Sequence, residues 1–315
     1  YKVILVLLDC SKAFDTINRP LLLDQLHNHG VHGNLFDILC GFFHERYQVV
    51  RVGSAQSQGE LTERGGPQGC VLTFFSWLIY INSICNCMSI SDPDIPTGYG
   101  LFVDDVATWI AHPDPEIAVS LMQERLTQIY NWREFHLITF NPTKFQLLDL
   151  TCDASAIAYD LSFGDTSLHW TLAFNDDKYL GVFVDDNRTF LPHLNKIYQK
   201  MIQRKYKIQN HCHFAHGSNP QFLLQMFKAY ILSVLEYGSP LWIFRLSCDP
   251  VTQFHWTNPV HQVYTKIWSK IVIFYNTMLR RILGVPDGTA TLVVYIRSGM
   301  LPLDYHLALN ALVWF

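Results

Sequence analysis

Two adjacent aspartates inside an apolar stretch constrain the fold of this chain more than any other feature of its sequence. Asp104 and Asp105 stand between two short apolar runs within residues 98–110, Gly-Tyr-Gly-Leu-Phe-Val-Asp-Asp-Val-Ala-Thr-Trp-Ile. Two apolar runs joined by polar residues are typical of a β-hairpin. Burying two carboxyl groups there would be costly without cations or partners. The pattern therefore predicts a hairpin whose turn carries both acids for a functional reason.

A third aspartate follows an apolar run near the start of the sequence. Residues 3–8, Val-Ile-Leu-Val-Leu-Leu, predict a buried strand with Asp9 at its tip. Adjacent strands of one sheet could bring Asp9 beside Asp104 and Asp105. Three carboxylates at one point repel one another and need divalent cations, and two Mg²⁺ ions held there can activate a 3′-hydroxyl and stabilise leaving pyrophosphate in an in-line phosphoryl transfer. The aspartates would act as oxygen ligands, not as nucleophiles.

The rest of the pattern predicts an α+β region followed by a helical one. We expect helices over about 20–29, 35–46, 71–84 and 115–135, and strands over about 48–52, 59–63, 144–150 and 179–184. The 71–84 helix is apolar nearly all round and is predicted to be buried. From about Pro192 onward helices dominate, with residues 292–296 ambiguous between helix and strand. The change in pattern predicts a domain boundary near residue 190.

The amphipathic helix predicted over 115–135 has a clear apolar face. The residues expected to point inward are Ile117, Val119, Leu121, Met122, Leu126, Ile129 and Trp132. Between the 59–63 strand and the next helix, residues 65–69 hold three glycines and a proline in five positions. Such a segment cannot be a helix or a central strand, so it must be a special loop.

Size and composition indicate a folded globular protein. The 315 residues are enough for two domains, and 49% of them are hydrophobic against 16% charged. We expect no membrane span, because the longest apolar run, Val71–Ile81, is shorter than the roughly 20 residues that a spanning helix needs. Tyr1 opens directly on the strand pattern with no signal-peptide pattern, and Leu307–Phe315 ends in an apolar helical pattern. We expect both ends to be cuts inside a longer protein.

The cysteines predict neither a disulfide framework nor a zinc site. Their positions are Cys10, Cys40, Cys70, Cys85, Cys87, Cys152, Cys212 and Cys248, mostly among apolar residues, and none forms a CxxC pair. We interpret them as reduced thiols of the core. The stretch from His211 to His216 holds three histidines and Cys212, but its spacings do not match a tetrahedral zinc site.

Charge gives two opposing indications about nucleic acid. The formal net charge is −4, which argues weakly against a nucleic-acid-binding protein. One segment of helical periodicity, however, carries five basic residues and no acid: Lys196, Lys200, Arg204, Lys205 and Lys207. A solvated helix face and a surface for phosphate groups are both open interpretations of this basic segment.

Five motifs in order resemble those of non-LTR (LINE-like) retrotransposon reverse transcriptases. Their matches are Leu8–Asp15 to a first palm motif of an acid, one variable residue and SKAFD; Gly65–Leu72 to GVPQGSVL; Phe102–Asp105 to FADD; Asn141 and Lys144 to the fourth motif; and Tyr179–Val182 to the YLG hairpin that grips the primer. Further along, Tyr230–Trp242 resembles the thumb helix, and Arg281–Pro286 resembles the post-thumb segment. The resemblance covers nearly the whole chain.

The resemblance implies an RNA-directed DNA polymerase, a nucleotidyltransferase that uses an RNA template, a DNA primer and dNTPs. It implies an α+β fold with an antiparallel palm sheet, packed helices and partial fingers over residues 1–190, and a mostly helical thumb and post-thumb segment over 191–315. Asp9, Asp104 and Asp105 would bind two Mg²⁺ ions, with Mn²⁺ as an alternative. Lys144 would sit near the triphosphate as a charge partner or proton donor, a solvated surface lysine being the alternative.

The resemblance also assigns substrate contacts. Phe14 would lie under the incoming sugar and leave no room for a 2′-hydroxyl; an ordinary core phenylalanine is the alternative. The residues that would line the nucleotide pocket are Gly66, Pro67, Gln68 and Gly69, where glycines allow close approach of the backbone. The residues that would contact the primer or the duplex backbone are Tyr179, Leu180, Gly181, Lys196, Lys200, Arg204 and Lys205.

Several positions depart from the family's motifs. Gly66 replaces Val, Cys70 replaces Ser, Phe74 stands where Pro is common, and Val103 replaces Ala. The basic finger residues that precede the first motif in family members are not in this sequence, and an endonuclease domain is expected in the full-length polyprotein. The family implies action in the nucleus. Two other interpretations stay open: a degenerate or domesticated copy that binds nucleic acid without catalysis, and an RNA-dependent RNA polymerase, against which Phe14 argues.

Overall fold

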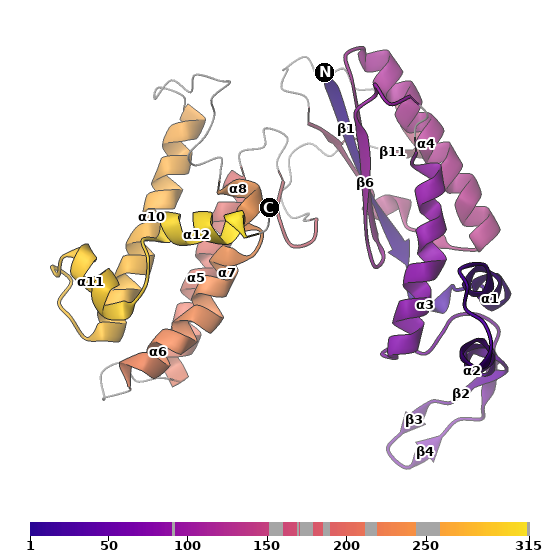
Figure 1. Cartoon of the computed structure of the whole chain (residues 1–315), viewed down its shortest axis with the longest axis horizontal. Coiled ribbons are helices and arrows are strands. Elements are labelled where there is room, and N and C mark those ends of the chain that lie inside the picture. The colour runs from indigo at the N-terminus through magenta and orange to yellow at the C-terminus, as the bar shows by residue number, and fades with distance from the viewer. Residues whose placement is uncertain are drawn as a thin grey trace. The chain divides into compact units, whose positions relative to one another are not determined.

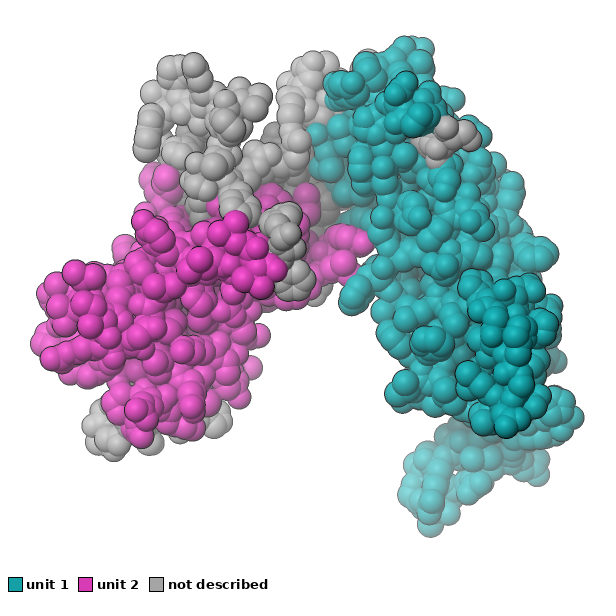
Figure 2. Space-filling model, viewed as in Figure 1, with its two compact units in different colours: residues 1–172 teal, residues 173–315 magenta. Residues whose placement is uncertain are grey.

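The computed structural model describes residues 1–89, 92–150, 160–168, 170, 179–184, 190–211, 219–243 and 259–313. The chain divides into two compact units, Tyr1–Leu172 and Ala173–Phe315, which Figure 2 colours teal and magenta. The boundary between the two units therefore comes before residue 190, where the sequence pattern changes. The palm and thumb assigned on either side of residue 190 stay predictions.

Unit 1 mixes helices with antiparallel sheet. Its elements are β1 (Lys2–Ser11), η1 (Ala13–Asp15), α1 (Arg19–Asn28), α2 (Asn34–Phe43), β2 (Arg46–Gln48), β3 (Arg51–Val52), β4 (Ala55–Gln56), β5 (Glu60–Thr62), α3 (Val71–Asn82), η2 (Ser83–Cys87), β6 (Thr97–Phe102), β7 (Asp105–His112), α4 (Pro115–His136), β8 (Thr139–Phe140), η3 (Pro142–Lys144), β9 (Gln146–Asp149), β10 (Leu161–Phe163) and β11 (Thr166–Leu168). The predicted α+β class is confirmed.

Strand β1 is the centre of the main sheet. The strand order is β6-β7-β1-β8, and β9 also pairs with β1; every pairing is antiparallel. The strand is longer than predicted because Cys10 and Ser11 pair with Phe140 and Thr139 of β8. Asp9 therefore lies within β1, and its predicted position at the tip of the strand is wrong.

Helix α4 packs against β1 and β7 of this sheet, and Figure 1 shows this helix beside the strands of unit 1. The Asp114 carboxylate caps its first turn by accepting from the Glu116 amide at 2.9 Å. Its buried apolar residues are Ala118, Met122, Leu126, Ile129 and Trp132, whose spacing of three or four residues follows one helix face. Ile117, expected to point inward, is 43% exposed. The buried face passes through Ala118 instead, one residue further along.

The same helix carries a buried guanidinium that holds it to the β6–β7 hairpin. Arg125 is 3% exposed; its Nη1 donates to Thr108 Oγ1 and its Nη2 to Thr97 Oγ1, both at 2.7 Å. Burial lowers the pKa of Arg125 to about 10, since the charged form loses water. Hydroxyl acceptors replace part of that solvation and fix the helix against both strands of the hairpin.

Helix α3 is buried on one face only, so the prediction of a helix buried all round is wrong. Its buried residues are Thr73, Ser76, Trp77, Tyr80 and Ile81. The exposed apolar ones are Val71, Leu72, Phe74, Phe75 and Leu78. The reason is that α3 packs against α1, η1 and η2, which contact one side of it. The opposite side is an exposed apolar surface.

Three other predicted elements differ in extent. The predicted hairpin of 48–52 with 59–63 is divided into two ladders, β2 with β5 and β3 with β4. Helix α2 ends at Phe43, before Arg46 enters β2. The predicted strand 179–184 is a tight turn with a single bridge between Tyr179 and Val182. Leu180 and Gly181 both have positive φ angles there, 47° and 83°, so the chain reverses direction instead of extending.

Unit 2 is helical, as the pattern after Pro192 predicts. Its described elements are α5 (Leu191–His211), α6 (Pro220–Phe227), the π-helical turn η4 (Lys228–Leu232), α7 (Ser233–Glu236), α8 (Ser239–Trp242), α10 (Pro259–Leu283), α11 (Thr291–Ser298) and α12 (Leu303–Leu312). The ambiguous 292–296 segment is thus helical. Side chains including Met201, Phe227 and Tyr275 form its core. Of the helices described in either unit, none is long and apolar enough to cross a membrane.

The cysteines described by the structure are free, but they are not all core residues. Cys10 is buried, whereas Cys40, Cys70, Cys85 and Cys87 are half-buried. The partial exposure of these four corrects the prediction that the thiols all belong to the core. The remaining cysteines, Cys152, Cys212 and Cys248, and the side chains of the His211–His216 stretch lie outside the described residues.

A buried histidine of unit 2, His193, is expected to make the stability of this unit depend on pH. His193 on α5 is 4% exposed, and its Nδ1 accepts from the Phe183 amide at 3.3 Å. Burial, and next the positive charge of Lys200, lower the pKa of His193 from 6.5 to about 4. The unfolded chain takes up this proton near pH 6.5 and the folded chain only near pH 4. Stability is therefore complete above pH 6.5 and falls as the pH is lowered, by about 3 kcal/mol at pH 4.

Urea unfolding at pH 7 and at pH 4.5 measures this loss. His193→Gln keeps a side-chain acceptor but does not titrate, so the variant should lose less stability between the two pH values than the parent chain. Other groups titrate alike in both proteins, and the difference isolates His193. Equal losses would contradict the prediction.

Candidate active site

The register between β1 and β7 brings the three predicted acids to one place. Asp9 lies directly opposite Asp105 in the antiparallel ladder. On the other side of β7, Phe102 pairs with Asp105, which leaves Val103 and Asp104 as a two-residue turn. Opposed residues of an antiparallel pair point to the same face. The hairpin predicted from the sequence is confirmed, but only Asp104 lies in its turn, since Asp105, also expected there, is the first residue of β7.

Two hydrogen bonds hold that turn in place. Trp77 of α3 donates its Nε1–H to the Val103 carbonyl at 2.7 Å, and the Cys10 amide donates to the Asp104 carbonyl at 3.3 Å. Val103 has a φ of 59°, a region that β-branched residues rarely adopt. The surrounding structure, and Trp77 in particular, therefore imposes the conformation that presents Asp104.

Negative charge is concentrated around the paired acids. The pKa of Asp105 is raised, first by burial and then by the carboxylates of Asp104 and Asp9. The buried thiol of Cys10 also has a raised pKa, through burial and then the same carboxylates. Carboxylate oxygens are the donors that Mg²⁺ prefers, so these residue types fit a divalent cation that would relieve the repulsion.

The described residues contain no group of three or more His, Cys, Asp or Glu side chains already arranged to hold a metal ion. The register sets the backbones of the three acids together, but their side chains are not gathered into a finished set of ligands. Their role as metal ligands stays a prediction.

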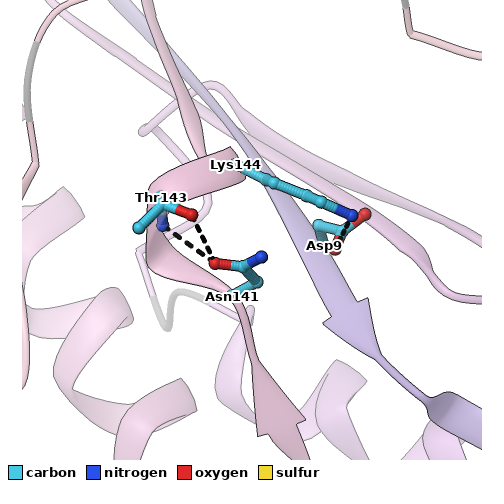
Figure 3. Close-up of polar contacts among 4 residues, drawn as sticks. All are labelled: Asp9, Asn141, Thr143 and Lys144. Carbon is cyan, nitrogen blue, oxygen red and sulfur yellow. Dashed lines mark hydrogen bonds and ion pairs between the residues drawn. The ribbon is translucent and has the colours of Figure 1, made fainter.

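Lys144 reaches the same place from the other edge of β1 (Figure 3). Its Nζ lies 3.4 Å from Oδ2 of Asp9. Asn141 shapes the short helix η3 that carries the lysine, since its Oδ1 accepts from the Thr143 amide at 3.2 Å and the Thr143 hydroxyl at 2.6 Å. The backbone amide of Asn141 also donates to the backbone carbonyl of Asp9 at 3.0 Å. Lys144 is 63% exposed, so this ion pair is weak and easily exchanged.

The glycine-rich segment is the special loop that its composition predicts. The Gly66 amide donates to the Phe14 carbonyl and the Gly65 amide to the Ile17 carbonyl, each at 2.9 Å. Gly65 has a φ of 75°, and a Cβ there would lie 2.7 Å from Asp15 Cα. Only glycine fits, because backbone atoms cannot move aside as a flexible side chain can. The loop is therefore pressed against the segment that carries Phe14.

A cavity of about 360 Å³ lies beside this loop. Its lining residues are Phe14, Pro67, Gly69, Cys70, Val71, Thr73 and Phe74. Phe14 itself is half-buried and contacts Trp77, with ring centroids 6.0 Å apart. Of the residues predicted to contact the nucleotide, Phe14, Pro67 and Gly69 thus border one cavity. Gly66 does not border it, and Gln68 turns elsewhere. Its amide donates to both oxygens of the Asp15 carboxylate, at 3.1 and 3.0 Å.

Arg19, which no sequence pattern singled out, holds the start of the glycine-rich loop by hydrogen bonds. This arginine is 8% exposed; its Nε donates to the Gly65 carbonyl at 2.7 Å, and its Nη1 to the Thr62 carbonyl at 2.6 Å. Nη2 donates to Thr62 Oγ1 at 2.8 Å and to the Arg64 carbonyl at 2.9 Å. Burial, and next Arg46, lower its pKa. The signal available was a cation in the first turn of a helix, where the helix dipole disfavours it.

The predicted primer-gripping residues form the tight turn of unit 2. The Tyr179 amide donates to the Val182 carbonyl at 3.0 Å, and the Val182 amide donates back at 2.9 Å. The Tyr237 hydroxyl donates to the Leu180 carbonyl. A Cβ on Gly181 would lie 3.0 Å from the Tyr237 ring. Tyr237, in the segment 230–242, therefore fixes the turn.

The basic segment of α5 is partly committed to contacts within unit 2. Arg204 Nη1 donates to the Tyr230 carbonyl at 2.7 Å. Lys205 Nζ lies 6.0 Å from the Phe274 ring centroid, and its pKa is lowered by burial and then by Arg281. Lys196 Nζ lies 5.8 Å from the Phe183 ring centroid, whereas Lys200 is exposed. Some basic side chains of the segment thus contact other parts of unit 2 while others face solvent, so the segment is not a uniformly solvated face.

Comparison with known proteins connects the chain to transposon enzymes. A Drosophila melanogaster protein described as a probable RNA-directed DNA polymerase from transposon BS is 24% identical over 211 residues, which are 65% of this chain and 22% of that protein. The chain thus spans about a fifth of the length of this relative.

Two solved structures resemble the chain more distantly. Telomerase from Candida albicans, in complex with the TWJ fragment of telomeric RNA, gives a TM-score of 0.40 at 13% identity, over 94% of this chain and 50% of that one. The Candida tropicalis counterpart gives 0.43 at 12% identity, over 98% and 49%. At these TM-scores the likeness does not establish a shared fold.

A family match covers unit 1 and the turn that follows it. The family described as reverse transcriptase (RNA-dependent DNA polymerase) matches residues 1–182, more than half of the 315 residues. The matched region includes the paired acids, the glycine-rich loop and the Tyr179–Val182 turn. The chain therefore belongs to the reverse transcriptase family.

Proposed function

We propose that the chain is the polymerising part of a non-LTR (LINE-like) retrotransposon reverse transcriptase, which extends a DNA primer along an RNA template with dNTPs. The observation that carries this proposal is the register that sets Asp9 opposite Asp105, with Asp104 in the adjoining turn. Residues 1–190 would be the palm with partial fingers, and 191–315 the helical thumb and post-thumb segment. The transposon origin of the Drosophila relative supports the assignment.

Asp9, Asp104 and Asp105 would hold two Mg²⁺ ions, or Mn²⁺ in their place. When bound, such ions would activate the primer 3′-hydroxyl and stabilise the departing pyrophosphate. Lys144 is exposed and held by one weak ion pair with Asp9. It can therefore turn to the triphosphate and donate a proton to the pyrophosphate, or neutralise its charge.

The nucleotide would lie against Phe14 and the 66–69 loop, and the primer against unit 2. Tyr179, Leu180 and Gly181 would contact the primer through a turn that Tyr237 keeps fixed. The basic residues proposed to contact the duplex backbone are Lys196, Lys200, Arg204 and Lys205. Such phosphate contacts position a duplex without reading its sequence. In the full-length polyprotein, an endonuclease domain would supply the nicked target.

Primer extension tests this proposal directly. The chain is incubated with a poly(rA)/oligo(dT) duplex, dTTP and Mg²⁺, beside an Asp104→Asn/Asp105→Asn variant and a longer chain that includes the basic finger residues of the family. Extension that the double variant lacks supports both the polymerase and the acids. If even the longer chain binds duplex but extends nothing, the protein is a degenerate copy that binds nucleic acid without catalysis.

Phe14→Val is expected to relax the choice between deoxyribonucleotides and ribonucleotides. The ring contacts Trp77 on one side and would occupy the space that a 2′-hydroxyl needs, whereas valine leaves that space open. We expect the preference for dTTP over UTP to fall about a hundredfold, the scale of one steric contact in a binding pocket. The ratio of kcat/KM values for dTTP and UTP measures it. Phe75→Val, which alters an exposed ring of α3, is the control and should leave the ratio unchanged.

A further inference from the structure

The hairpin turn that presents Asp104 has a backbone conformation that valine does not favour. Of its two residues, only Val103 has a positive φ, 59°. Two-residue hairpin turns with a positive φ at the first position usually have glycine there, because glycine has no Cβ to clash with the backbone. A β-branched residue is strained in this region, and such strain persists only where neighbouring groups hold the chain in place.

A buried tryptophan on α3 holds this turn by one of its peptide groups. The Nε1–H of Trp77 donates to the Val103 carbonyl at 2.7 Å, which belongs to the peptide group that joins Val103 to Asp104. Because a peptide group is planar, a bond to its oxygen also fixes the direction in which the chain enters Asp104. The Cys10 amide donates to the Asp104 carbonyl at 3.3 Å, a longer and therefore weaker bond.

The indole itself has little freedom to move. Trp77 is fully buried, and its ring centroid lies 6.0 Å from that of Phe14 and 6.1 Å from that of Tyr80. The Tyr80 hydroxyl in turn donates to the His136 carbonyl. The core of unit 1 therefore fixes the donor, so the hydrogen bond lasts only while the Val103 carbonyl keeps its present direction.

We propose that Trp77 is a positioning residue for the metal ions of the proposed polymerase. Its indole N–H keeps Val103 in the strained conformation, and the turn thereby keeps Asp104 next to the other two acids. The inference rests on the proposed function, since the metal ions are what would require the three acids at one place. Without the bond, the turn would relax and the peptide group before Asp104 would rotate. Val103→Gly would allow the positive φ without strain, so the turn would no longer need Trp77.

Urea unfolding shows whether Trp77 maintains the strain, and it requires no metal ion. Val103→Gly should raise the ratio of folded to unfolded chain about fivefold in the parent, because relief of the strain exceeds the backbone entropy that glycine loses. In Trp77→Phe, which keeps an aromatic ring but lacks the donor, the turn has already relaxed. The same Val103→Gly change should then raise the ratio by less than about twofold. Equal gains in the two backgrounds would overturn the proposal.

Binding of Mn²⁺ alone, followed by electron paramagnetic resonance, tests the consequence for the acids. The binding that Asp104→Asn/Asp105→Asn loses is the signal of the site. Trp77→Phe should weaken this binding about tenfold, the scale on which groups that orient metal ligands act. Val103→Gly added to Trp77→Phe should restore the affinity to within about twofold of the parent, since it makes the positive φ accessible without the indole. Glycine cannot repair a general loosening of the core, so failure of this rescue would also overturn the proposal.

Trp132→Phe is the matched control. Trp132 is also a buried tryptophan, and its Nε1–H donates to Ser83 Oγ at 3.0 Å, a bond that joins α4 to η2 and does not involve the turn. This variant loses an indole donor as Trp77→Phe does, so it should be less stable than the parent. Its affinity for Mn²⁺ should be unchanged. Equal weakening of Mn²⁺ binding in the two variants would show that Trp77 acts only through general stability.

Primer extension separates this inference from the proposed function. Trp77→Phe should raise the Mg²⁺ concentration for half-maximal extension about tenfold and leave the preference for dTTP over UTP unchanged, because phenylalanine keeps a ring beside Phe14. If no chain extends a primer while Mn²⁺ binding follows the expected pattern, the polymerase proposal fails and the positioning role stands. If the parent binds no more Mn²⁺ than Asp104→Asn/Asp105→Asn does, the role in metal binding is overturned.

Discussion

Replacing Asp105 with asparagine is expected to lower the rate of primer extension on the order of a thousandfold, the scale on which phosphoryl transfer depends on groups that stabilise its charge. Asp105 is opposite Asp9, and its pKa is raised by burial and by the two other carboxylates. Asparagine keeps the size and the start of β7 but removes one negative charge from the cluster. Affinity for a divalent cation falls while the hairpin stays intact.

A single-turnover extension rate at saturating duplex measures this effect. Asp24→Asn is the control, because Asp24 is an exposed acid on α1 of the same unit and should leave the rate unchanged. Duplex affinity, followed by fluorescence anisotropy, should be nearly equal in both variants and the parent. A rate within threefold of the parent for Asp105→Asn would show that the paired acids do not serve the reaction.

Arg19→Met is expected to reduce the free energy of unfolding of unit 1 by about 4 kcal/mol, since one buried and three partly buried acceptors lose a charged donor at once. The methionine fills similar space but leaves the carbonyls of Thr62, Arg64 and Gly65 without the hydrogen bonds that Arg19 makes. Lysine should recover only part of the loss, because its ammonium cannot present the planar fork of a guanidinium.

Arg46→Met provides the comparison within the same region. Arg46 donates a single hydrogen bond, to the Phe42 carbonyl at 3.0 Å, and is only partly buried. Its replacement should cost under about 1 kcal/mol. Urea unfolding of all three variants measures the differences. If Arg19→Met and Arg46→Met are equally stable, the loop does not depend on the buried guanidinium.

The acid-bearing hairpin could be predicted because its signal is local. The apolar runs on either side of Asp104 and Asp105 define both strands, and the residues of the turn lie between them. The pairing of Asp9 with Asp105 has no such local signal, because it depends on which strands become neighbours. The sequence allowed that pairing and the motif order favoured it, but only the register in the sheet fixes it.

Other features depend on contacts that no local pattern records. The apolar pattern of α3 predicts burial on all sides, yet burial depends on which elements cover the helix, and α1, η1 and η2 contact one side. Arg19 donates mainly to backbone carbonyls, which every sequence has, so residue types reveal little of its partners. The 179–184 segment fails as a strand because Leu180 adopts a positive φ, a conformation that leucine does not favour.

The central position of β1 sets the order in which unit 1 can be completed. Residues 4–8 of this strand are strongly apolar, but their partners β7 and β9 occupy residues 105–112 and 146–149. During synthesis, the two edges of β1 therefore stay uncovered until β7 and β9 have been made. Contacts between such distant segments slow folding, and an apolar strand with open edges can pair with other chains in the meantime. Protein made without residues 146–149 should therefore aggregate through β1, even though it contains every residue of the acid cluster.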